Sequence, residues 1–168
     1  MSIRTTKPAL DEHSVLRDHV EHFLVDAHAM PGLDLAARID AVERTAAFLA
    51  EMLLPHAAIE ERVLYPGAAR LVGGPDERDT VRADRRAVRD LLAQLAVADP
   101  ADTGALQEVL YALYALLNAH LWREEEVFVK LAGAPDQERV YEVMERMAAM
   151  RPPRRRFERG ARAAPAPR

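Results

Sequence analysis

The residues of this chain that are best suited to chemistry form two copies of one motif. Each copy is a His-x-x-x-Glu sequence with a second glutamate directly behind it: His56, Glu60 and Glu61 in the first copy, and His120, Glu124 and Glu125 in the second. Residues four apart lie on the same face of a helix, so each copy offers an imidazole and a carboxylate side by side. Both groups are ligands for divalent transition metals. The motifs therefore indicate a metal centre between two helices.

Both motifs interrupt an apolar stripe that has helical spacing. In steps of four and three, the stripes are Val42, Ala46, Leu49, Leu53, His56, Glu60 and Val63 in one segment, and Leu106, Leu110, Leu113, Leu117, His120, Glu124, Val127 and Leu131 in the other. Polar groups in an apolar core destabilise the fold unless something satisfies them. Taken alone, either copy is better read as a satisfied core histidine and an exposed glutamate. The matched register of the two copies favours a shared metal.

Proline and glycine separate the segments that must position these motifs. The pattern predicts four long helices and a short fifth one, over residues 9–29, 34–64, 76–97, 102–131 and 136–150. Four long helices with short connections predict an all-α fold, an antiparallel up-down-up-down four-helix bundle with a short fifth C-terminal helix. We assign residues 8–150 to this bundle and expect Pro66-Gly67 to open a connector. Pro55 removes one hydrogen bond of the second helix and predicts a kink there, which either tilts His56 or is simply tolerated.

Composition limits the remaining possibilities. The chain has no cysteine, which excludes disulfides, thiolate catalysis and cysteine-held metals. No apolar run suits a signal peptide or a membrane span, so we expect a cytoplasmic protein. The net charge of −4 gives no reason to expect a specific nucleic-acid partner. Residues 151–168 carry seven arginines and one glutamate, and this composition predicts a disordered basic tail. The tail either solubilises the protein or contacts nucleic acid, anionic lipid or the acidic body of another copy.

A buried metal with two carboxylates needs further ligands from the other helices. The first helix has an apolar face of Val15, Leu16, Val20, Phe23, Leu24 and Ala27. His19 lies within that face and is the expected third imidazole, while His13 lies on its edge and is a second choice. On the third helix, the inward position between Val81 and Val88 is Arg85. A guanidinium there either pairs with an inward carboxylate, Glu60 or Glu124, or reaches water.

The chain resembles the hemerythrin-like, HHE cation-binding family over residues 10–132. The strings that carry the resemblance are Leu16-Arg17-Asp18-His19, His56-x-x-x-Glu60-Glu61 with Val63-Leu64-Tyr65-Pro66, and His120-x-x-x-Glu124-Glu125 with Val127-Phe128. The resemblance implies a non-haem di-iron centre in a four-helix bundle. It also implies that His19, His56 and His120 are imidazole ligands, that Glu60 and Glu124 are bridging carboxylates, and that His13, Glu61 and Glu125 are additional candidates. Arg85, after Asp84, replaces the histidine that the family places on helix three.

The resemblance and the departure at Arg85 together lead to two functional hypotheses. The first is an iron-binding protein that binds or responds to dioxygen, peroxide, nitric oxide or iron itself, with one or two iron ions in preference to manganese and most simply with one. The second is a metal-free binding or regulatory module in which an Arg85–Glu pair takes the place of the metal. Neither requires catalysis. An enzyme of this kind would carry out peroxide- or oxygen-related redox chemistry. We expect a small diatomic or peroxide ligand and allow for a homodimer.

Overall fold

The computed structural model describes residues 3–73 and 77–150, and every regular element in these ranges is helical. The predicted all-α class is confirmed, since no strand occurs in the described part of the chain. Residues 1–2, 74–76 and 151–168 lie outside it, and the predicted basic tail falls in the last of these ranges.

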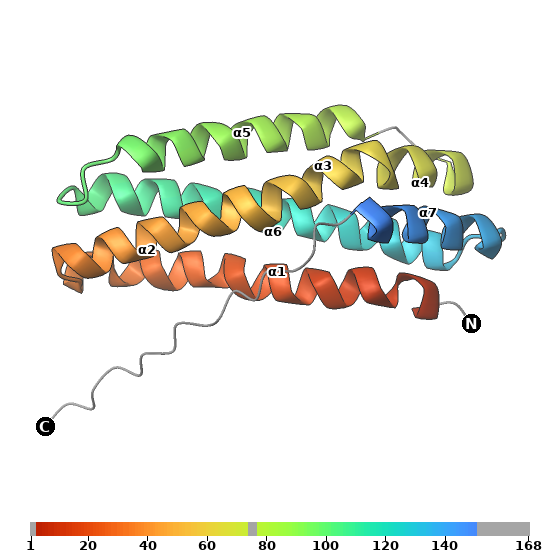
Figure 1. Ribbon diagram of the computed structural model, residues 1–168, viewed down its shortest axis with the longest axis horizontal. Helices are drawn as coiled ribbons and strands as arrows, with labels where there is room; N and C mark the ends of the chain where they lie inside the picture. Colours follow the sequence, from red (N-terminus) through yellow and green to blue (C-terminus); the bar gives the residue numbers. More distant parts are fainter. Residues whose placement is uncertain (1–2, 74–76, 151–168) are drawn as a thin grey trace, which may run out of the picture.

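Four long helical runs lie side by side along the length of the molecule (Figure 1). They are α1 (Ile3–Ala29), the continuous run of α2 (Leu35–Phe48), η2 (Leu49–Leu53) and α3 (Leu54–Arg62), α5 (Arg78–Val97), and α6 (Thr103–Ala132). Each run points in the opposite direction to the run before it in Figure 1. A short η1 (Met30–Gly32) follows α1, α4 (Leu64–Val72) extends the second run, and α7 (Gln137–Met150) packs against α4 and α1.

Aspartate caps explain why two of the helices begin where the sequence predicts. Asp34 Oδ1 accepts a hydrogen bond from the Ala37 N–H at 2.8 Å, and Asp102 Oδ1 accepts one from the Ala105 N–H at 3.0 Å. Each cap satisfies a backbone donor that has no partner within the helix, which contributes about 1 kcal/mol. The expected starts near residues 34 and 102 are therefore confirmed.

The expectation that Pro66-Gly67 opens a connector is wrong, because both residues lie inside α4. Pro66 occupies the first turn of α4, where a missing backbone N–H breaks no intrahelical hydrogen bond. Gly67 is buried against α7, and a Cβ atom at this position would lie 2.7 Å from Val143 Cγ2. Glycine is therefore needed here because it lets α7 approach α4 closely.

A turn of π-helix, η2, lies directly before Pro55 and shifts the register of the second run. The Leu54 N–H bonds to the Leu49 carbonyl, five residues earlier, so the turn holds one residue more than an α-helical turn. After this turn the predicted inward residues are buried: Leu53, His56, Glu60 and Val63. Before it the stripe moves by one position, and Ala41, Thr45 and Phe48 are buried. The predicted inward residues Val42 and Ala46 are therefore only partly buried, although Val42 still packs against the apolar core.

The apolar core consists of two clusters that lie on either side of the ligand-type residues along the bundle. One cluster joins the later half of α1 to α2, η2, α5 and the first half of α6, and it includes Phe23, Phe48 and Leu113. The other joins the start of α1 to α3, α4, α7 and the end of α6, and it includes Leu64 and Phe128. Polar side chains with metal-ligand chemistry therefore lie between two apolar clusters, and the packing of these clusters fixes the helices around them.

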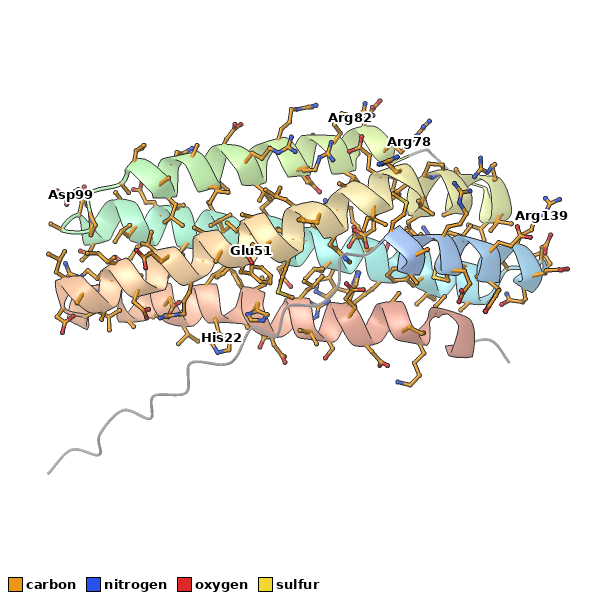
Figure 2. The ribbon with its side chains drawn as sticks, in the orientation of Figure 1. His22, Glu51, Arg78, Arg82, Asp99 and Arg139 are labelled. Carbon is orange, nitrogen blue, oxygen red and sulfur yellow. The ribbon has the colours of Figure 1, made fainter. Side chains whose placement is uncertain are left out.

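The surface is charged, as the outward-pointing Arg78, Arg82 and Arg139 illustrate (Figure 2). Among the described helices, none combines the length and the apolar composition needed to cross a membrane.

Candidate metal centre

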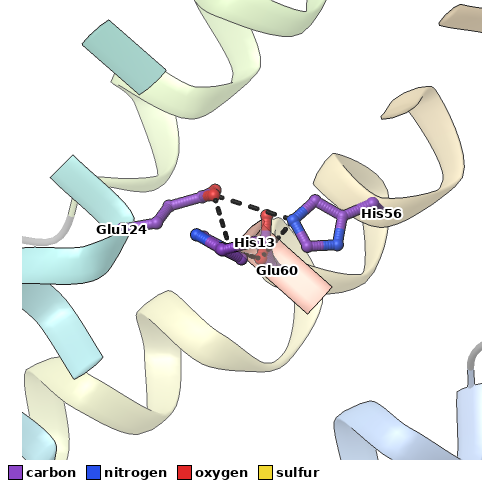
Figure 3. A group of neighbouring side chains, drawn as sticks. All are labelled: His13, His56, Glu60 and Glu124. Carbon is purple, nitrogen blue, oxygen red and sulfur yellow. Dashed lines mark ion pairs between the residues drawn. The ribbon is translucent and has the colours of Figure 1, made fainter. Parts of the chain in front are cut away.

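Four buried side chains from three helical segments converge at the junction of the two apolar clusters (Figure 3). They are His13 from α1, His56 and Glu60 from α3, and Glu124 from α6. One ligand-type atom from each lies within 4.8 Å of the others. We call these residues the four-residue cluster.

The facing atoms in the four-residue cluster are imidazole Nε2 and carboxylate oxygen. His13 Nε2 lies 3.5 Å from Glu60 Oε1 and 3.4 Å from Glu124 Oε2. His56 Nε2 lies 2.8 Å from Glu60 Oε1 and 3.7 Å from Glu124 Oε2. Two nitrogen and two oxygen donors therefore surround one point, which is a donor set suited to a borderline transition metal.

His120 extends the centre on the opposite side of Glu124. Its Nε2 atom lies 3.0 Å from Glu124 Oε1, while Glu124 Oε2 faces His13 and His56. Glu124 thus divides its two oxygens between two sides. Because His120 and Glu124 are one helical turn apart on the same stripe of α6, both are buried, as the sequence predicts.

The structure brings His13 into the cluster and places His19 elsewhere. The imidazole of His19 stacks on Phe48 with the ring centroids 4.8 Å apart, and it is only partly buried. The buried stripe of α1 runs in regular steps of four and three through Ala9, His13, Leu16, Val20, Phe23, Ala27 and Met30. This 4–3 spacing is visible in the sequence and would have ranked His13 above His19. Of the other histidines on α1, His22 points away from the bundle (Figure 2), and His28 is exposed.

The second glutamate of each motif is held by arginine outside the cluster. Glu61 Oε1 accepts from Arg82 Nε at 3.0 Å, and Glu61 Oε2 lies 2.8 Å from Arg85 Nη2. Glu125 pairs with an arginine of α1, Arg17. Adjacent residues point about 100° apart around a helix, so the glutamates behind Glu60 and Glu124 face neighbouring helices.

The partner predicted for Arg85 therefore needs correction. Arg85 lies between the buried Val81 and Val88, as predicted, but it pairs with Glu61 and not with Glu60 or Glu124. The two inner carboxylates consequently have no guanidinium beside them among the ion pairs of the described residues.

Burial and mutual charge shift the pKa values in the centre. Burial disfavours the charged form of His120, but the negative charge of Glu124 and the contact with Asp84 outweigh it and raise the pKa of His120 to about 10. The pKa of His56 is raised against the same desolvation by the charge of Glu60. Burial and the charge of Glu124 together raise the pKa of Glu60. Burial also opposes the charged form of Glu124, but His120 outweighs it and holds the pKa of Glu124 well below its usual value.

The inner atoms of this centre fit a bound cation. Nε2 of all three imidazoles and both oxygens of Glu60 and Glu124 are buried and have no hydrogen-bond partner of good geometry among the described residues. Buried polar groups in proteins are normally satisfied, and unsatisfied ones call for an explanation such as an ion. A metal ion bound among these seven atoms, all of them metal-ligand types, would satisfy them.

A small cavity adjoins His120 between α3, α5 and α6. Its volume is about 10 Å³, and its lining consists of Leu53, Leu54, Ala57, Asp84, Arg85, Val88, Leu117 and His120. This volume holds about one water-sized molecule. His120 is the one imidazole in the lining, and no member of the four-residue cluster lines this cavity.

Fold and centre together define a helical protein with a buried histidine–carboxylate cluster that could hold a metal ion. The model of the hemerythrin HHE cation-binding domain family matches residues 9–132, and this chain belongs to that family. The match confirms the family expected from the two motifs. No curated protein and no solved structure matches the chain.

Proposed function

We propose that this protein is a metal-binding bundle that holds one iron ion at the four-residue cluster, with the Nε2 atom of His120, which lies beside Glu124 Oε1, as a further ligand. The observation that carries the proposal is the set of unsatisfied inner atoms, above all the two fully buried carboxylates of Glu60 and Glu124. Burying a carboxylate whose oxygens lack well-formed hydrogen bonds is costly. A divalent cation between the two carboxylates balances their charge and gives the imidazole nitrogens a partner.

A single ion follows from the distribution of ligands around Glu124. The side that faces Glu124 Oε2 has two imidazoles and Glu60. The side that faces Glu124 Oε1 has His120 alone, with Arg85 lining the adjoining cavity. A second divalent ion there would have one imidazole and would lie near a positive guanidinium, which repels it.

The bound iron would supply reversible redox chemistry and a coordination position for a small diatomic molecule or peroxide. The residues of the chain hold the ion away from bulk water, because His13, His56, Glu60, His120 and Glu124 are all buried. The cavity beside His120, whose lining includes Leu117 and Val88, has room for about one water-sized molecule. We therefore propose a role in binding or sensing such a ligand, or in sensing iron, within a domain that spans residues 8–150.

The test is the metal content of the protein as purified and after anaerobic reconstitution with Fe²⁺. We expect one tightly held iron per chain by elemental analysis and an absorption band in the near-ultraviolet after exposure to air. Metal-free protein whose thermal stability is unchanged by Fe²⁺ would reject the proposal and would favour the alternative, a binding module that works without metal.

A further inference from the structure

The outer nitrogen of each inner histidine faces a carboxylate from a neighbouring helix. The three contacts are His120 Nδ1 to Asp84 Oδ2 at 3.2 Å, His56 Nδ1 to Glu12 Oε1 at 3.7 Å, and His13 Nδ1 to Glu125 Oε1 at 3.9 Å. All three rings are therefore oriented alike, with Nδ1 outward and Nε2 toward Glu60 or Glu124. We call Asp84, Glu12 and Glu125 the outer carboxylates.

These contacts join the helices around the centre. They link α5 to α6, α1 to α3, and α6 to α1. Two of the outer carboxylates are fixed from behind by arginine: Asp84 by Arg123, and Glu125 by Arg17, which also donates to Asn118 at 3.1 Å. The arginine holds the carboxylate in place, so that its oxygen stays directed at the ring nitrogen.

We propose that the outer carboxylates are positioning residues that orient the imidazole rings, with Nδ1 toward the carboxylate and Nε2 toward the metal, and that Asp84 is the strongest of the three. This inference rests on the proposed function. A ring N–H donated to a carboxylate fixes the tautomer and the orientation of a ligating histidine and increases its basicity. Asp84 ranks first because its contact is the shortest and because Arg123 holds it.

The first experiment measures metal affinity in variants that neutralise one outer carboxylate each. Co²⁺ serves as the probe, since its visible absorption reports the ligand set, and affinity is measured by competition with a chelator. We expect Asp84→Asn to weaken Co²⁺ binding by about 10-fold or more. Glu12→Gln and Glu125→Gln should have smaller effects. The matched controls, Asp90→Asn, Glu21→Gln and Glu126→Gln, remove exposed carboxylates from the same three helices and should change the affinity less than about 2-fold.

A second measurement separates positioning from simple charge. Asp84→Asn leaves the charge of Arg123 without its partner near His120, and this charge alone could repel the metal. The double variant with Arg123→Gln removes that charge. If positioning is the cause, the double variant still binds Co²⁺ weakly, whereas a return to wild-type affinity would overturn the proposal.

A spectroscopic readout tests the tautomer directly. In Zn²⁺-loaded wild-type protein, long-range ¹H–¹⁵N spectra should show His13, His56 and His120 bound through Nε2, with a downfield Nδ1–H signal on His120. Asp84→Leu should move or broaden that signal and leave those of the other two rings in place. Coordination of His120 through Nδ1, or an unchanged signal in Asp84→Leu, would refute the inference.

Failure of the positioning role can be distinguished from failure of the proposed metal-binding function. Wild-type protein that binds neither Co²⁺ nor Zn²⁺ contradicts the metal site itself. Wild-type protein that binds both, with equal affinity in Asp84→Asn, contradicts only the role of the outer carboxylates. Helical content measured by circular dichroism, compared with the controls, identifies any variant that has lost its fold.

Discussion

Replacing Arg85 by histidine should give the protein a second metal position beside His120. Arg85 and His120 line the same cavity, and Glu124 Oε1 faces His120 at 3.0 Å. The substitution supplies an imidazole on the inward face of α5 and removes a positive charge. We expect wild-type protein to hold one iron ion per chain and Arg85→His to hold two.

The size of the effect follows from the charge of the guanidinium. A divalent ion about 5 Å from an unpaired guanidinium is repelled by about 7 kcal/mol at an effective dielectric constant of about 20, which corresponds to about five orders of magnitude in affinity. This is an upper limit for Arg85, because its ion pair with Glu61 offsets part of the charge. The loss of Arg85 itself destabilises the fold little. Glu61 keeps Arg82 as its partner at 3.0 Å, so the loss of Arg85 does not leave this carboxylate unpaired.

The assay is anaerobic loading with Fe²⁺, removal of free metal and elemental analysis against protein concentration. The control is Arg85→Gln, which removes the charge without supplying an imidazole and should remain at one tightly bound ion. Two irons in wild-type protein, with Arg85 in place, would show that the guanidinium does not exclude the second ion. One iron in a folded Arg85→His variant would show that ligand number does not limit the site.

Three further predictions concern the ligands, the stability and the pH dependence. His13→Ala should abolish tight Fe²⁺ binding while His19→Ala keeps it, measured by elemental analysis; the reverse result would mean that His19 is the ligand. Fe²⁺ at 100 times its dissociation constant should stabilise the fold by about 2.7 kcal/mol, seen as a rise in Tm of about 5–10 °C that a chelator reverses. In metal-free protein the raised pKa of His120, about 10, contributes stability that is fully present below about pH 6.5 and is lost as the pH rises through 10. Metal binding displaces the same proton, so denaturant titrations should show the stability gained from Fe²⁺ increasing from pH 6 to 9, and a constant gain would contradict this assignment.

The sequence was sufficient for the parts of the centre that depend on helical periodicity alone. His120 and Glu124 lie on an uninterrupted α-helix, and each of the eight residues predicted for the stripe of α6 is buried. His56 and Glu60 are also placed correctly, because they follow the π turn. The same rule, applied strictly to α1, selects His13. His19 belongs to a broader apolar face of α1 that includes Val15. This face is not buried throughout, since Val15 is 39% exposed.

Other features could not be read from a single helix. The π turn before Pro55 depends on backbone hydrogen bonding over five residues, and apolar periodicity does not reveal it. The pairing of Arg85 with Glu61 depends on how a long, flexible side chain orients between two helices. The contact of Glu12 with His56 joins residues that are far apart in the sequence, and no spacing rule marks it.

The π turn also separates two tasks within one continuous helical run. The residues before it, in α2, follow the packing of the apolar core, and those after it, in α3, follow the geometry of the ligands. In a regular helix a single register must serve both, so a change that improves packing would rotate His56 and Glu60 away from their partners. Here the extra residue of the π turn offsets the register of α2 from that of α3. Substitutions in α2 can therefore alter the stability of the bundle without rotating the imidazole of His56.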